Sequence, residues 1–212
     1  MATTTVVHLL RHGEVHNPSG VLYGRLPDYH LSELGRLMAV RAAEALADRD
    51  IAIVTSSPLE RAQETALPVA AAHELAIGTD PDLIEADNVF EGKKVTPRTL
   101  ATNPGFWLHM SNPFRPSWGE PYVELAGRMR SAIARAREQA RGREAVLVSH
   151  QLPIWIARLD VEGRRFAHDP RKRQCSLASL TSLHFEDDAV SAVVFSEPSA
   201  DLLPQSTNAT GA

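Results

Sequence analysis

Three short apolar segments, each ending abruptly in polar residues, most constrain the fold of this chain. They cover residues 6–10, 51–55 and 145–148. Runs that are apolar throughout are typical of strands buried on both faces of a parallel sheet. Capping residues and apolar spacing predict helices over residues 32–48, 58–73, 122–141 and 152–159. Strands that alternate with helices predict an α/β fold, a three-layer α/β/α sandwich on a mostly parallel sheet.

The remaining segments define the domain organisation. Residues 177–185 and 189–195 are separated by an acidic turn and predict a hairpin at a sheet edge. Residues 79–119 hold five prolines and two tryptophans with little periodicity, which indicates a cap inserted over the sheet edge. We therefore expect one domain over residues 1–196, and a disordered tail rich in Ser, Pro and Thr over residues 197–212.

Composition excludes several classes of function. A net charge of −4 and a pI near 6.1 give no bulk attraction to nucleic acid or to an anionic membrane, so we expect neither partner. The single cysteine, Cys175, excludes an intrachain disulfide and a multi-cysteine zinc site. The first residues do not resemble a signal peptide, and no apolar run approaches the ~18 residues of a membrane span. We expect a cytoplasmic enzyme or binding protein.

Polar side chains follow all three predicted strands. The set is Arg11 and His12 after the first strand, Ser57 and Arg61 after the second, and His150 after the third. Because parallel strands bring their carboxyl ends to one edge of a sheet, we expect these groups to converge. Each group alone is an ordinary strand-end residue, but two arginines and two histidines together suit a tetrahedral dianion. His12 is then left to attack phosphorus, while a backbone carbonyl holds its other ring nitrogen.

Three motifs carry a resemblance to a known family. They read Leu10-Arg11-His12-Gly13-Glu14, Ser56-Ser57-Pro58-Leu59-Glu60-Arg61-Ala62-Gln63-Glu64-Thr65 and Val148-Ser149-His150. Together they resemble the histidine phosphatase superfamily, also called phosphoglycerate mutase-like, and the resemblance covers about residues 6–195. It implies a phosphoglycerate mutase-like fold, a phosphohistidine on His12, and a phosphate clamp made of Arg11, Arg61 and His150. It also implies chemistry that uses no metal and no cofactor.

The family also uses a carboxylate from the cap region to give a proton to the leaving alcohol. Leu83-Ile84-Glu85, followed by Glu91-Gly92, resembles the segment that carries it. Glu85 is therefore the expected proton donor, and Asp87 is its rival. A glutamate in a closed site near a dianion binds its proton more tightly, as an acid needs.

The chain departs from the family pattern at several positions. The segment after Glu85 lacks a usual glycine and is one residue shorter. Asn17 is the expected counterpart of an asparagine that touches the phosphate, although it comes one residue early. Gln151 stands where a glycine usually follows the second histidine; its backbone N–H remains available to phosphate, and its side chain is free to face the substrate. Gly13 is expected to let the backbone approach the substrate closely.

Three functions remain open. The leading one is a metal-independent phosphatase that hydrolyses small phosphomonoesters through a phosphohistidine. The sequence does not decide whether the protein forms a homodimer. The second is a cofactor-dependent phosphoglycerate mutase, but residues 85–89 read Glu-Ala-Asp-Asn-Val instead of the Glu-Arg-His-Tyr-Gly motif of that branch. The third is a phospho-ligand binding module without turnover, which the intact His12 and Glu85 disfavour.

Two further features have alternative interpretations. The cap aromatics form either an apolar leaving-group pocket or a small core of the cap; they are Phe90, Trp107, Phe114 and Trp118. The basic run over residues 164–173 is either a solvated face or a guide for an anionic substrate. The substrate itself is not defined by the sequence.

Overall fold

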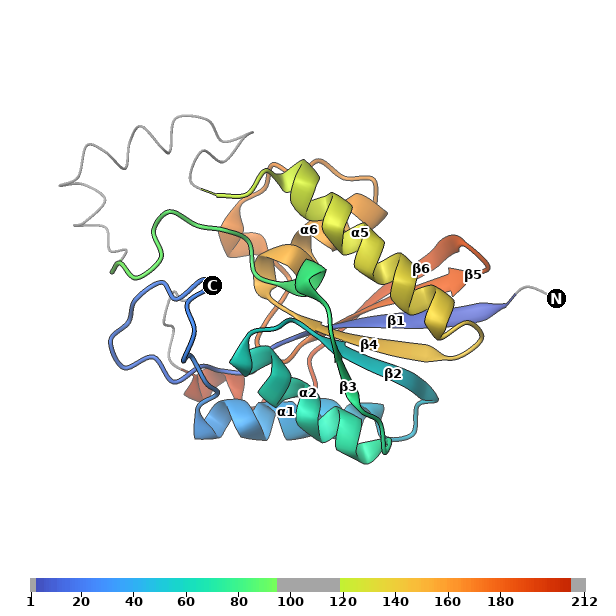
Figure 1. The fold of residues 1–212 in the computed structure, drawn as a ribbon, viewed down its shortest axis with the longest axis horizontal. Helices are drawn as coiled ribbons and strands as arrows, with labels where there is room; N and C mark the ends of the chain where they lie inside the picture. The colour runs from blue at the N-terminus through green and yellow to red at the C-terminus, as the bar shows by residue number, and fades with distance from the viewer. Residues whose placement is uncertain (1–2, 95–118, 207–212) are drawn as a thin grey trace.

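A central sheet between two layers of helices forms the body of the protein (Figure 1). The computed structural model describes residues 3–94 and 119–206. Six strands make up the sheet, in the order β3-β2-β4-β1-β5-β6. The first four of this order run parallel, while β5 and β6 form an antiparallel extension at one edge. The strands are β1 Thr4–Arg11, β2 Ile51–Ser56, β3 Ile77–Thr79, β4 Glu144–Ser149, β5 Leu180–Glu186 and β6 Ala189–Ser196.

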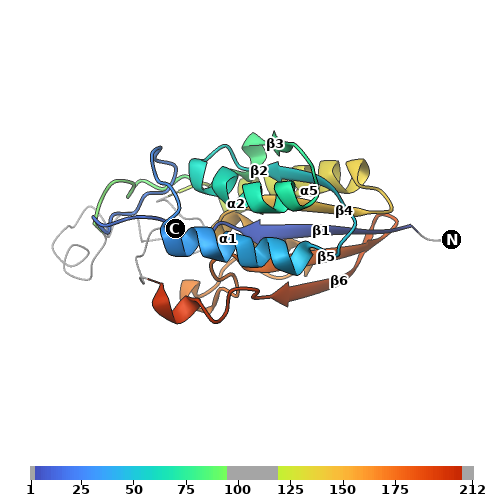
Figure 2. The same cartoon turned by 90° about the horizontal axis from the view of Figure 1, so that it is seen from below.

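Two long helices cover each face of the sheet (Figures 1 and 2). α1 (Glu33–Leu46) packs beside α2 (Glu60–Ala72) on one face, and α5 (Tyr122–Gln139) packs beside α6 (Gln151–Val161) on the other. The Ser32 hydroxyl oxygen accepts a hydrogen bond from the Gly35 N–H at 2.9 Å, which confirms Ser32 as the N-cap of α1. The architecture is thus the predicted three-layer α/β/α sandwich.

The central strands are mainly apolar because they are buried on both faces. Alternate residues of a strand point to opposite sides of the sheet. Leu9 of β1 and Leu147 of β4 belong to the core that contains Met129 of α5. Leu10 and Val148, one residue further along, belong to the core beneath α1 and α2. A continuous apolar run therefore serves two separate cores, with the parallel strands as their common wall.

The predicted hairpin is confirmed as β5 and β6. Residues 197–206, expected to be disordered, instead follow a defined backbone course that includes a 3₁₀ helix over Leu203–Gln205. Ser199 is buried there, and its hydroxyl donates a hydrogen bond to the Leu177 carbonyl at 3.3 Å. Of the cap aromatics only Phe90, which is buried, lies within the described residues. Within residues 3–94 and 119–206, no helix combines the length and hydropathy that a membrane crossing requires.

Candidate active site

His12 lies directly after β1 and is completely buried. The backbone holds it on both sides, because its N–H donates to the Ser149 carbonyl at 3.1 Å and its ring Nδ1 lies 2.8 Å from the Gly13 carbonyl. A carbonyl can only accept, so Nδ1 carries the proton. Nε2 therefore has a free lone pair, and no described residue bonds to it. Burial, together with the nearby Arg61 and Arg11, lowers the pKa of His12 well below 6.5, which keeps the imidazole neutral.

Arg11 and Arg61 bring two positive charges to this ring, and neither has an ion-pair partner among the described residues. Arg11 Nη1 donates to the Cys175 carbonyl at 2.7 Å. Arg61, fully buried, donates from Nη2 to the Gly24 carbonyl, and its guanidinium carbon lies 4.7 Å from the centre of the Tyr23 ring. The Nε atoms of both arginines and Nη1 of Arg61 have no described partner. Buried cations with unused donors favour an anion, since an unpaired buried charge is costly.

His150 follows β4 and forms the other wall of the site. Its ring centre lies 5.1 Å from that of His12. Its Nε2 lies 2.8 Å from the Ser57 hydroxyl, and Nδ1 has no described partner. Burial, followed by the charge of Arg61, lowers its pKa well below 6.5. A hydroxyl that donates to Nε2 of the neutral ring leaves the Nδ1–H as a donor into the site. The strand ends thus bring together the groups that the motifs single out.

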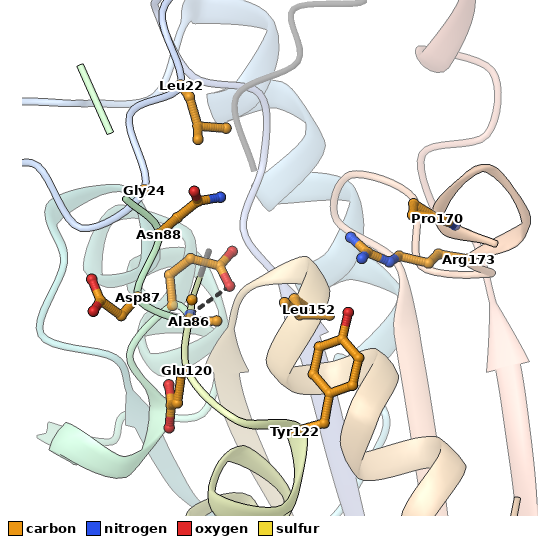
Figure 3. A pocket seen from close by; sticks show the side chains of 12 residues that line it. Leu22, Gly24, Ala86, Asp87, Asn88, Glu120, Tyr122, Leu152, Pro170 and Arg173 are labelled. Atoms are coloured by element: carbon orange, nitrogen blue, oxygen red, sulfur yellow. Dashed lines mark hydrogen bonds between the residues drawn. The ribbon is translucent and has the colours of Figure 1, made fainter. Parts of the chain in front are cut away.

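Glu85 is the buried carboxyl of the cap segment. Its Oε1 accepts a hydrogen bond from the Ala86 N–H at 2.8 Å, whereas Oε2 has no described partner. Burial raises the pKa of Glu85, and this outweighs the lowering by the Ala86 N–H hydrogen bond and by the charges of Arg61 and Arg11. The rival, Asp87, is exposed, and Figure 3 shows its carboxylate at the outer wall of the pocket, directed away from the other labelled side chains. Glu85 is therefore buried beside the pocket, whereas the Asp87 carboxylate is exposed to solvent.

An ion-pair network fixes the backbone that carries Glu85. Arg25 Nε donates to the Glu85 carbonyl at 2.7 Å. The same guanidinium donates from Nη2 to Glu120 at 3.0 Å, and Glu120 also accepts from Arg128 of α5 at 2.7 and 2.9 Å. Arg128 Nη1 in turn donates to the Asp82 carbonyl. The cap segment is thus bonded to both the loop before α1 and the body of α5. We call Arg25, Glu120 and Arg128 the cap triad.

The side-chain amides of Asn17 and Gln151, both expected near the phosphate, are hydrogen-bonded within the chain. The amide of Asn17 donates to the Val21 carbonyl at 2.8 Å and accepts from the Val21 N–H at 3.3 Å, so this side chain braces its own loop. Gln151 Oε1 accepts from Arg173 at 3.2 Å, and Gln151 Nε2 donates to the Cys175 carbonyl at 3.3 Å. No described hydrogen bond joins either side chain to His12. The Gln151 amide thus joins the start of α6 to the segment that carries Arg173 and Cys175.

Gly13 lies close to α1. A Cβ atom at this position would lie 2.4 Å from the Gly35 carbonyl oxygen of α1. The glycine thus lets the end of β1 approach the helix, and the chain next to His12 is bonded further by the Gly13 N–H, which donates to the Thr65 hydroxyl at 3.1 Å. Thr65 itself donates to the Arg61 carbonyl at 2.7 Å. This close packing positions the nucleophile candidate and one clamp arginine together.

A pocket opens beside Glu85, and Figure 3 shows its wall. Its lining includes Leu22, Asn88, Tyr122, Leu152 and Arg173. Sequence reasoning missed Tyr23 and Arg173. Tyr23 lies in a turn-rich loop without periodicity, and Arg173 was one of several similar cations in the run 164–173. Among the described residues, no cluster of three or more His, Cys, Asp or Glu side chains has the arrangement of a metal site.

The fold is that of phosphoglycerate mutase-like proteins. The site at the strand ends gathers two arginines and two histidines, all of them buried. A model of the histidine phosphatase superfamily (branch 1) matches residues 7–198, and the chain belongs to this superfamily.

Comparison with individual proteins gives both phosphatases and mutases. An uncharacterised protein of Mycobacterium tuberculosis is 56% identical over 201 residues, which cover 94% of this chain and 100% of that protein. A probable phosphoglycerate mutase of Yersinia pestis is 31% identical over 183 residues, 82% of this chain and 83% of that protein. The solved structure of a mycobacterial glucosyl-3-phosphoglycerate phosphatase has a TM-score of 0.72 and 27% identity, and covers 92% of this chain and 97% of that one. These similarities support a phosphoryl-group hydrolase or mutase.

Proposed function

We propose that this protein is a metal-independent phosphatase that hydrolyses phosphomonoesters through a phosphohistidine on His12. The observation that carries the proposal is the unpartnered Nε2 of the buried His12 ring, close to two buried guanidiniums that have no ion-pair partner among the described residues. A phosphate dianion placed among Arg11, Arg61 and His150 pairs with the unused donors. The clamp then stabilises charge on the equatorial oxygens as the phosphoryl group moves.

The reaction has two steps. First, the lone pair of His12 Nε2 attacks phosphorus and the P–O bond to the leaving group breaks, while protonated Glu85 gives its proton to the departing oxygen. Second, ionised Glu85 takes a proton from water, the hydroxyl adds to phosphorus, and the P–N bond breaks. Phosphate then leaves, with His12 neutral and Glu85 protonated again. The raised pKa of Glu85 supports its role in the first step.

A phosphoglycerate mutase is the second candidate. The 31% identity to a probable mutase favours it, and the chemistry of the first step is the same. The residues after Glu85 favour hydrolysis, because they lack the motif of the cofactor-dependent branch. A mutase must also return the phosphoryl group to a retained product before water reacts. The two functions are separated by following isomerisation of 3-phosphoglycerate beside phosphate release.

The test combines turnover with trapping of the intermediate. In EDTA we expect phosphate release from a panel of phosphomonoesters that includes 4-nitrophenyl phosphate, 3-phosphoglycerate and glucosyl-3-phosphoglycerate. Rapid quenching in alkali with ³²P-labelled substrate should trap an acid-labile phosphohistidine. His12→Asn should lose both turnover and label, because asparagine offers no nucleophilic lone pair.

His16→Gln is the matched control, since this histidine is exposed and lies in the same segment. It should keep both signals, and circular dichroism should show that both variants are folded. Label that persists in His12→Asn would refute the assignment of the nucleophile. Isomerisation without net phosphate release would replace the phosphatase with the mutase.

A further inference from the structure

A third cation, Arg173, faces the pocket from the side opposite the cap segment. It follows a 3₁₀ helix over Pro170–Lys172, and Figure 3 shows its guanidinium directed into the pocket, with Tyr122 and Leu152 beside it. Its Nε donates to His168 Nε2 at 2.9 Å and its Nη1 donates to Gln151 at 3.2 Å. No described residue accepts from its Nη2. The Arg173 side chain is therefore fixed by two hydrogen bonds, while its Nη2 group remains available as a donor.

The partners of Arg173 leave its charge uncompensated. His168 Nδ1 lies 2.6 Å from the Phe166 carbonyl, so Nδ1 carries the proton and Nε2 is the acceptor of a neutral ring. Burial lowers the pKa of His168, in agreement with this neutral form. Gln151 is neutral as well. No carboxylate of the described residues lies within ion-pair distance of Arg173. A positioned, half-buried guanidinium with neutral partners favours an anionic ligand.

The other residues of the pocket wall also favour an anionic ligand. Asn88 Oδ1 accepts from the Phe90 N–H at 3.0 Å, which leaves the amide N–H₂ of Asn88 free to donate toward the pocket. The hydroxyl of Tyr122 lies on the same wall as Arg173 (Figure 3) and makes no described hydrogen bond. The acidic residues that line the pocket are Glu85, Asp87 and Glu120. Glu120 is paired within the cap triad, Asp87 is directed away, and Glu85 is the proton donor proposed above. The unused donors of Arg173 and Asn88 therefore remain available to an anion.

We propose that Arg173 recognises a second anionic group, a carboxylate or a second phosphate, on the leaving group of the substrate. The proposal rests on the phosphatase function proposed above, because it assigns this pocket to the leaving group. Glu85 lines the same pocket, so an alcohol that receives its proton must extend along this wall. In this arrangement Arg173 binds the leaving group and selects the substrate, while Arg11 and Arg61 bind the transferred phosphoryl group. The alternative, a third phosphoryl clamp, predicts equal losses for all substrates.

The experiment uses substrate pairs that differ only in the second anion. 3-Phosphoglycerate is compared with glycerol 3-phosphate, in which a hydroxymethyl group replaces the carboxylate. Fructose 1,6-bisphosphate is compared with fructose 6-phosphate, which lacks the second phosphate. The first pair reports a carboxylate and the second reports a phosphate. For each pair the ratio of kcat/KM values is measured in the wild type, in Arg173→Gln and in Arg171→Gln.

We expect the wild type to prefer the more anionic member of at least one pair. Arg173→Gln should reduce that ratio by about tenfold or more, which corresponds to about 1.4 kcal/mol. Arg171→Gln is the matched control, because Arg171 is exposed and paired with Asp169; it should leave the ratio unchanged. A ratio near one in the wild type, or an equal fall for both members of each pair in Arg173→Gln, would overturn the proposal.

Failure of the proposed function gives a different result. In that case no member of either pair is turned over and no phosphohistidine forms. Calorimetry then tests Arg173 directly, with the same pairs as ligands of the wild type and of Arg173→Gln. A tenfold weaker binding of 3-phosphoglycerate alone, or of fructose 1,6-bisphosphate alone, would support an anion site without catalysis. Equal affinities within both pairs would refute the Arg173 proposal as well.

Discussion

Glu120→Gln is the perturbation that most directly tests how the cap holds the proton donor. Glu120 is only 13% exposed at its side chain, and it accepts hydrogen bonds from both Arg25 and Arg128. Glutamine keeps the shape but removes the charge and places an N–H₂ group against guanidinium donors. The two arginines then lose their common counter-ion in a partly buried place. Arg25 is more exposed than Arg128, so we expect the Arg25 side chain to shift in the variant. Its hydrogen bond to the Glu85 carbonyl would then weaken.

The magnitude follows from the burial of the network. Removing one partner of a buried ion pair costs about 3–5 kcal/mol, and the partial exposure of Arg25, 33% at its side chain, places this case near the lower end. We therefore expect a loss of about 3 kcal/mol in the free energy of unfolding. For a chain of this size each kcal/mol lowers the Tm by about 2–4 °C, so the Tm should fall by roughly 6–12 °C.

Calorimetry or thermal-shift melting measures the stability change, and steady-state kinetics measures the effect on Glu85. Because a displaced acid matters most for a poor leaving group, kcat should fall more for phenyl phosphate than for 4-nitrophenyl phosphate. Glu33→Gln is the matched control: Glu33 is 92% exposed and pairs with Arg36, so its loss should cost less than about 0.5 kcal/mol. A Tm fall for Glu120→Gln no larger than that of the control would refute the reasoning.

Two further predictions test the acid and the packing behind the nucleophile. Glu85→Gln should slow phenyl phosphate far more than 4-nitrophenyl phosphate, and equal slowing would move the acid role elsewhere. Burial raises the pKa of Glu85, so its acid form is lost only as pH rises through that raised value. The wild type should therefore show an alkaline decline in kcat for phenyl phosphate that the variant lacks. Identical pH profiles of the two proteins would contradict this. Gly13→Ala should destabilise the fold by about 1–3 kcal/mol, because its Cβ would meet the Gly35 carbonyl at 2.4 Å. Gly127→Ala in α5, where nothing lies within 4 Å, should instead stabilise by about 0.5–1 kcal/mol, and urea unfolding would show whether the two signs are opposite.

The elements that the sequence predicted best are those specified by local patterns. β1 and β4 were evident because burial on both faces requires mainly apolar side chains. Ser32 marked the start of α1 because a side-chain cap acts within one turn. The course of residues 197–206 was harder to predict from the sequence. Ser199 is buried by a contact with Leu177, and polar composition alone gave no sign of that contact.

In the candidate site, too, some features follow from local patterns in the sequence and others depend on tertiary contacts. The convergence of His12, Arg61 and His150 was predictable, because parallel strands place their carboxyl ends at one edge whatever the rest of the chain does. Asn17 was expected at the phosphate, but its amide bonds within its own loop. The direction of a loop side chain depends on which backbone groups need partners, and sequence spacing does not report this.

The sequence by itself determined the layered fold, the strand-end positions of the reactive groups and the family, because periodicity and short motifs act over neighbouring residues. The tertiary structure alone decided the protonation and the neighbours of those groups. Segments far apart in the chain bury both side chains, and this burial lowers the pKa of His12 and raises the pKa of Glu85. Arg173 became distinguishable from the other cations of its run only when folding placed it opposite the cap. Burial and electrostatic fields depend on the whole assembled chain, and no local pattern encodes them.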